Sequence, residues 1–315
     1  MHLHTLTILL VTSAVAFALL GPVPAMLERA RWPSREPRAA LILWQAIGLA
    51  GGVAVLAAAM SLALAPLHPS PLIAAGAFAG NLFAGDPTGG LGVAHFVLFL
   101  FALAMSARLA GVLPMTIWRT WQARHRHRDL VGLVSRPWPA SRPGHGHVLD
   151  HPVAAVYCLP GRAVRGAPRV VFTTGALAQL DDTELSAVLA HEHAHLTERH
   201  DLVAMPFLAW VTAFPWFPGV RRARVSVAML LELVADDRAA TTADPAALAS
   251  ALARIGGSAG AATPDGALAI TGAGVLLRVR RLLDPPPRSP RWRATAYLMA
   301  ATLVMLPPSV MLPVW

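Results

Sequence analysis

One short stretch of the chain carries residue types that can hold a metal ion. His191 and His195 are four residues apart, and Glu192 directly follows the first histidine. Residues at this spacing lie on one face of a helix, one turn apart, so both imidazoles can reach one ion. Glu192 then lies where a carboxylate can take a proton from a metal-bound water. The spacing predicts a zinc site with hydrolytic chemistry. The alternative is a surface helix that happens to carry histidines.

A catalytic zinc ion needs a third protein ligand and one open position. Glu198 shares the helix face but lies ~10 Å further along the axis, too far to join the histidines. Asp201 could serve only in a longer motif whose required glycine is replaced here by Glu198. Elimination leaves Glu232 as the third ligand. Asp236 follows it on the same helix face, where it can accept a hydrogen bond from a ligand histidine. The alternative for this pair is an exposed acidic face.

Two kinds of element must position these residues. Residues 152–158 and 169–173 are apolar segments separated by a turn-rich stretch, which predicts a β-hairpin. Asp181 and Glu184 form a capping signature, so we expect the histidine-bearing helix to begin at about residue 182. A second helix, at about residues 224–242, is expected to carry Glu232.

The composition indicates a membrane protein. Of the 315 residues, 55% are hydrophobic and 14% are charged, whereas ordinary soluble domains carry roughly a quarter charged residues. Residues 6–26, 39–64 and 89–107 are each long and apolar enough to cross a bilayer. Residues 294–315 form a less regular fourth candidate, because Pro307 and Pro308 interrupt them. The first run has no preceding positive residue, which argues against a cleaved signal peptide.

The positive charges lie beside the apolar runs. There are 26 basic residues, all arginine, against 17 acidic ones, which gives a net charge of 26 − 17 = +9. Their clusters predict an N-terminus outside the cell and a cytoplasmic region from residue 108 to 293. Contact with anionic lipids accounts for this charge better than direct nucleic acid binding. The single cysteine, Cys158, excludes an internal disulfide and a cysteine-based metal cluster.

We therefore expect four regions. Residues 1–117 form a membrane region and residues 118–151 a basic juxtamembrane linker, whose histidines have a metal-binding tract as the alternative reading (His125, His127, His145 and His147). Residues 152–287 form the cytoplasmic metal-binding domain, and residues 288–315 hold the last span. Within the domain, residues 203–220 are apolar and rich in proline. We expect a membrane-dipping hairpin or a wall facing the bilayer there, with a buried core helix as the alternative.

Three segments together resemble a known group of enzymes. Residues 160–202 contain HEHAH, residues 232–240 read ELVADDRAA, and residues 278–287 read RVRRLLDPPP. They resemble the membrane-embedded gluzincin metallopeptidases, above all the BlaR/MecR-type antirepressor peptidases. The HtpX-like and CAAX prenyl protease families share the core motifs. The resemblance covers about residues 154–287. It implies a mainly α-helical integral membrane protein, with about four transmembrane helices and an inserted α+β zincin-like (gluzincin) metalloprotease domain.

The resemblance also implies roles for individual residues. His191, His195 and Glu232 would hold one Zn²⁺ per chain, Glu192 would act as general base and acid, and Asp236 would hydrogen-bond a ligand histidine. The strand before the active helix could then hold an extended substrate as an added strand. The candidate residues in that strand are Val170, Val171, Phe172 and Thr173.

The expected function is zinc-dependent endoproteolysis at the plasma membrane, with a protein substrate such as a soluble DNA-binding repressor. BlaR/MecR proteins continue into an extracellular penicillin-binding domain, and this chain ends at Trp315. We therefore expect any signal to come through the membrane segments or a separate sensor protein. The alternatives are an HtpX-like quality-control protease and a catalytically silent signalling protein. A metal transporter is a weaker reading, because the spans hold almost no ionisable residues.

Overall fold

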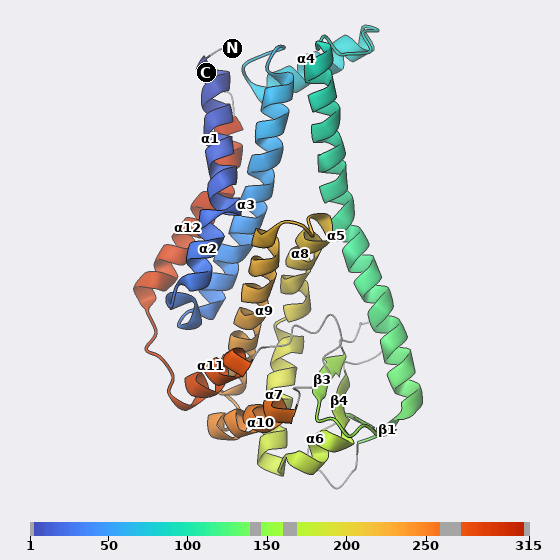
Figure 1. Ribbon diagram of the computed structural model, residues 1–315, viewed down its shortest axis with the longest axis vertical. Helices are drawn as coiled ribbons and strands as arrows, with labels where there is room; N and C mark the ends of the chain where they lie inside the picture. Colours follow the sequence, from blue (N-terminus) through green and yellow to red (C-terminus); the bar gives the residue numbers. More distant parts are fainter. Residues whose placement is uncertain (1–2, 139–145, 160–168, 259–271, 312–315) are drawn as a thin grey trace. The chain divides into compact units, whose positions relative to one another are not determined.

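The computed structural model describes residues 3–138, 146–159, 169–258 and 272–311 (Figure 1). The chain divides into two compact units. The first comprises residues 1–115, 206–224 and 289–315, and the second comprises residues 116–205 and 225–288. The first unit is made of three separate segments of the chain and the second of two, so neither is a continuous stretch.

The first unit is built on the long helix α3 (Pro37–Leu64). Helices α1 (Leu3–Leu20) and α12 (Pro290–Met311) both pack along it, as Figure 1 shows. The short helices α2 (Pro22–Arg29) and η1 (Trp32–Ser34) connect α1 to α3. The starts of α3 and α12 are joined by the Glu36 carboxylate, which accepts the Ser289 N–H at 2.8 Å, and by stacked Trp32 and Trp292 rings. The N-terminal ends of α3 and α12 therefore lie together.

Three stretches among the described residues are long and apolar enough to cross a membrane: Leu6–Arg29, Pro37–Leu64 and the helix Val93–Val134. They coincide with the first three expected runs, which supports a membrane protein. Helix α12 is not among these three stretches, and the fourth span stays a prediction. The helix includes Pro307 and Pro308, where the sequence favours an irregular outer half.

Helix α5 (Val93–Val134) is longer than the sequence analysis expects. After helix α4 (Pro71–Phe83), α5 continues through residues 118–134, the first half of the expected linker. From residue 115 to 131 the sequence has no proline or glycine, so nothing in it ends the helix. The first half of this linker is therefore helical.

The expected hairpin at residues 203–220 is helical. It consists of the end of α8 (His200–Ala213), a turn, and the start of α9 (Pro218–Ala239). Within the first unit, the Trp210 indole packs against α3 where Gly48 and Gly52 leave room for it. A Cβ atom on Gly52 would lie only 2.6 Å from the ring. Glycine at this position lets the large ring approach the helix backbone.

The second unit contains a four-stranded sheet in the order β1-β2-β4-β3. The strands are β1 (Ser135–Pro137), β2 (His147–Leu149), β3 (Val156–Leu159) and β4 (Arg169–Thr173). The antiparallel pairing of β3 with β4 confirms the predicted β-hairpin. Strands β1 and β2 were not expected, and β2 lies within the predicted linker.

Helices cover both faces of this sheet. Val131, near the end of α5, packs with Leu159 and Val171 on one face. On the other face, Phe172 packs with Leu185 and other apolar residues of the helices that follow the sheet. These helices are α6 (Thr174–Gln179), α7 (Asp182–Thr197), α10 (Pro245–Ser258) and α11 (Gly272–Leu283).

The position of β4 overturns one prediction. Val170, Val171, Phe172 and Thr173 lie in an inner strand, with β2 on one side and β3 on the other. The backbone N–H and C=O groups of an inner strand are already hydrogen-bonded to both neighbouring strands, so a substrate strand cannot be added to it. The sequence suggested an edge strand only because β2 was not anticipated.

Candidate metal centre

Helix α7 begins where the capping signature predicts. The Asp181 carboxylate accepts the Glu184 N–H at 2.8 Å, and the Glu184 carboxylate accepts the Asp181 N–H at 3.1 Å. This reciprocal capping box satisfies two backbone donors that the first turn otherwise leaves unpaired. The buried Glu184 side chain also accepts the Ser250 hydroxyl of α10 at 2.6 Å. The start of α7 is therefore fixed both locally and by packing.

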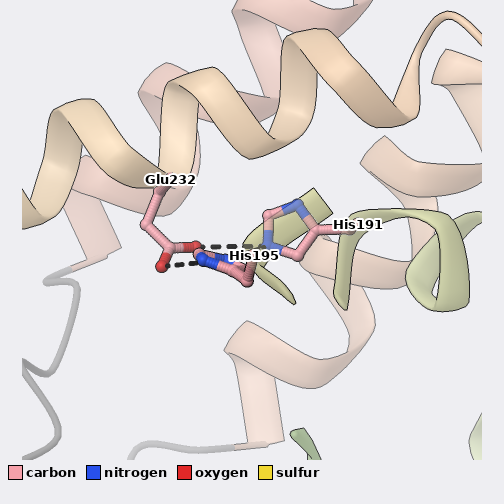
Figure 2. Close-up of side chains that lie close together, drawn as sticks. All are labelled: His191, His195 and Glu232. Carbon is pink, nitrogen blue, oxygen red and sulfur yellow. Dashed lines mark hydrogen bonds and ion pairs between the residues drawn. The ribbon is translucent and has the colours of Figure 1, made fainter. Parts of the chain in front are cut away.

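Two helices bring three potential metal ligands together. His191 and His195 project from α7 and Glu232 from α9, as Figure 2 shows. The two Nε2 atoms lie 3.1 Å apart, and the Glu232 carboxylate oxygens lie 3.4 Å and 3.5 Å from them. Ligands about 2.0–2.1 Å from a tetrahedral zinc ion lie about 3.3 Å from one another. The arrangement therefore fits one such ion. Among the described residues, no other group of this kind comes together.

Asp236 lies where the sequence analysis expects it. One of its carboxylate oxygens is 3.0 Å from His191 Nδ1, on the ring edge opposite the Nε2 atom that faces Glu232. A carboxylate at this point holds the proton of a histidine on Nδ1 and leaves Nε2 free to bind a metal. Asp236 is 1% exposed, so water cannot replace it as a partner of the ring.

The sequence analysis missed Arg278, which lies in α11. Its guanidinium donates to both carboxylate oxygens of Asp236, from Nε at 2.8 Å and Nη2 at 2.7 Å. Its Nη1 lies 2.9 Å from Glu232 Oε2. The residue is 4% exposed, and its charge balances the two buried acids. The segment RVRRLLDPPP was noted for its resemblance alone, and no local spacing links Arg278 to Asp236, 42 residues earlier.

Glu192 lies next to strand β3. Burial raises the pKa of Glu192, and hydrogen bonding from the nearby thiol and backbone of Cys158 opposes the rise. Burial also raises the pKa of the Cys158 thiol, and the Glu192 charge adds to the rise. The thiol is therefore a hydrogen-bond donor here rather than a reactive thiolate.

The buried charges shape the proton affinities of the ligands. Burial lowers the pKa of His191, but its bonds to Asp236 and Glu232 outweigh burial and raise the pKa to about 9. Burial lowers the pKa of His195 to about 4. Burial alone raises the pKa of Glu232. The bond to His191 and the charge of Arg278 lower it by a larger amount, so the pKa of Glu232 is lowered overall. At neutral pH Glu232 is therefore anionic and His195 neutral, the forms that bind a metal, whereas His191 holds a second proton that a metal ion must displace.

His200, in the next helix α8, contacts the ligand His195. Its Nδ1 atom lies 2.9 Å from Nδ1 of His195. Between the two helices, Arg199 has a φ of 51°, a left-handed conformation that ends α7 and turns the chain into α8. The neighbouring Asp201 pairs with Arg124 at 2.9 Å, and Glu198 Oε2 lies 3.8 Å from His200 Nε2. Neither acid joins the ligand group, in agreement with the sequence analysis.

Comparison with known proteins yields one match. No curated protein and no solved structure matches this chain. The family match does not distinguish between the BlaR/MecR, HtpX-like and CAAX prenyl protease types. Residues 142–249, which include His191, His195 and Glu232, match the model of peptidase family M48.

Proposed function

We propose that this chain is a membrane-bound zinc metalloendopeptidase. The observation that carries the proposal is the convergence of two imidazole Nε2 atoms and one carboxylate at mutual distances of 3.1–3.5 Å. This donor set, two imidazole nitrogens and one carboxylate oxygen, is typical of catalytic zinc sites that keep a fourth position open. The family match supports a protease, and the three long apolar helices support a membrane location.

The residues around the ligands have complementary tasks. A zinc ion held there would polarise the scissile carbonyl and lower the pKa of the attacking water to about 7. The Glu192 carboxylate would accept a proton from the attacking water and pass it to the leaving amine. Burial of Glu192 suits this task, because it raises the pKa of the carboxyl group towards neutral pH. Arg278 keeps Glu232 and Asp236 in place while both are charged.

Within the described residues β3 lies at the edge of the sheet, so it is a better place for an extended substrate than β4. Ala155 O accepts the Thr173 N–H at 3.1 Å. Because antiparallel partners alternate, Val156 and Cys158 turn their backbone groups away from β4. Cys158 is close enough to Glu192 to influence its pKa, so this edge lies next to the proposed base. A peptide added along β3 would bring its backbone to the site, which suits cleavage within a chain.

For the biological role we propose regulatory proteolysis of a transcriptional repressor in the cytoplasm, with the N-terminus outside the cell and a separate sensor protein. The antirepressor-like motifs around the ligands support this role. The match to peptidase family M48 is equally consistent with the second candidate, HtpX-like quality control of membrane proteins.

The test is N-terminal proteomics on host cells that express the wild type or Glu192→Gln. One or two new termini in a soluble DNA-binding protein, absent with Glu192→Gln, would support repressor cleavage. Many termini across membrane proteins would support quality control instead. Equal termini in both strains under several stresses would overturn the protease proposal in favour of a silent protein. Zinc content of both purified proteins serves as the control, because Glu192→Gln should leave the ligand set intact.

A further inference from the structure

His200 is a buried histidine that the proposed chemistry does not use. It is 5% exposed, and it faces His195 from the first turn of α8. The two Nδ1 atoms are 2.9 Å apart, so one of them donates to the other. Within the described residues, His200 Nε2 is a buried nitrogen without a hydrogen-bond partner. The ring therefore has one strong contact, and that contact is the proposed zinc ligand.

The direction of this hydrogen bond decides whether His195 can bind a metal. If His195 Nδ1 carries the proton and donates, its Nε2 has a lone pair that faces the other two ligands. If His200 donates instead, neutral His195 carries its proton on Nε2, and that atom cannot bind. We propose that His200 is a positioning residue that accepts the His195 Nδ1 proton and so holds Nε2 ready for the metal. This inference rests on the metal site of the proposed function.

Glu198 supports the required form of His200. An accepting Nδ1 on a neutral ring means that the remaining proton lies on Nε2. Glu198 Oε2 lies 3.8 Å from this Nε2, a distance at which its negative charge favours a proton there. The left-handed Arg199 between the two residues turns His200 back towards α7. The backbone thus places His200 in contact with His195, and the charge of Glu198 favours the proposed direction of the bond.

The two histidine ligands consequently have different supports. His191 has the carboxylate of Asp236 at its Nδ1 atom, whereas His195 has a neutral imidazole. A carboxylate accepts this hydrogen bond more strongly than a neutral ring does. His191 therefore has a strong hydrogen-bond partner and His195 a weaker one. The strength of metal binding at His195 depends on the residue at position 200.

The test compares two amides of similar chemistry in the full-length protein. Asparagine places its carbonyl oxygen close to the position of a histidine Nδ1, whereas glutamine reaches the position of Nε2. We expect His200→Asn to keep the zinc dissociation constant, measured by competition with a chelating dye, within about threefold of the wild type. His200→Gln should weaken zinc binding by about 10–100-fold, the usual effect of losing such a support.

A third variant and a structural control complete the design. His200→Asp supplies a carboxylate acceptor and should bind zinc at least as tightly as the wild type. Thermal unfolding with zinc removed shows whether each variant is folded before titration. Equal zinc affinity of the Asn and Gln variants, with both folded, would overturn the role of His200 and leave the proposed function standing. Absence of zinc binding by the wild type would overturn the proposed function itself.

Discussion

Replacing Arg278 by methionine tests whether one buried cation holds the acidic part of the site together. Methionine keeps the length and apolar stem of the side chain but removes its charge and donors. Asp236 would lose two hydrogen bonds, of 2.8 Å and 2.7 Å, and Glu232 would lose its 2.9 Å partner. Asp236 is 1% exposed, so water cannot compensate for this loss.

The expected cost follows from burial. Removing one partner of a buried ion pair destabilises a protein by about 3–5 kcal/mol, because an uncompensated charge stays inside. For a unit of this size, about 1 kcal/mol corresponds to roughly 2–4 °C in melting temperature. Arg278→Met should therefore lower the melting temperature of the zinc-free protein in detergent by about 6–20 °C. Added zinc should reduce this difference, since it supplies positive charge beside Glu232.

Arg281 provides a matched control on the same pair of helices. It pairs with Asp237, whose side chain is 41% exposed. Pairs at an exposed carboxylate contribute about 0–1 kcal/mol, so Arg281→Met should shift the melting temperature by at most about 4 °C. The reasoning fails if the two variants melt at the same temperature without zinc. It also fails if Arg278→Met unfolds like the wild type.

Three further measurements follow from the structure. Asp181→Ala should lower the free energy of unfolding in urea by about 1 kcal/mol through loss of the helix cap, and Glu184→Ala by more, because it also loses the Ser250 hydrogen bond. Gly52→Leu should lower the melting temperature, and the drop should be smaller in a Trp210→Ala background. Gly76 serves as the control position, because a side chain added there meets no atom within 4 Å. Chelation should destabilise the protein by about 2.7 kcal/mol relative to zinc at 100 times its dissociation constant, as measured by thermal unfolding.

The features that sequence reasoning predicted well depend on local spacing. The start of α7 follows from Asp181 and Glu184, which need only three residues between N-cap and partner. The shared face of His191 and His195 follows from the helical repeat, and the β3–β4 hairpin from two apolar segments around a turn. In each case the interaction energy that fixes the structure comes from residues close together in the chain.

The features that it missed depend on distant partners. Whether β4 is an inner or an edge strand is decided by its parallel pairing with β2, a strand of three residues with little pattern of its own. The role of Arg278 depends on packing of α11 against α9. The contact of His200 with His195 depends on the left-handed conformation of Arg199. A residue other than glycine adopts this conformation only occasionally, so the sequence gives no sign of it.

The spread of the site along the chain has a consequence for the order of synthesis. His191 precedes Arg278 by 87 residues, a stretch that ribosomes translate in roughly 4–17 s at about 5–20 residues per second. During this interval the nascent chain holds the histidines, then Glu232 and Asp236, without the arginine that balances them. The two acids repel each other until α11 is made or a metal ion binds. The proposed metal site therefore gains its balancing cation only after α11, the last helix that contributes to it, has been synthesised.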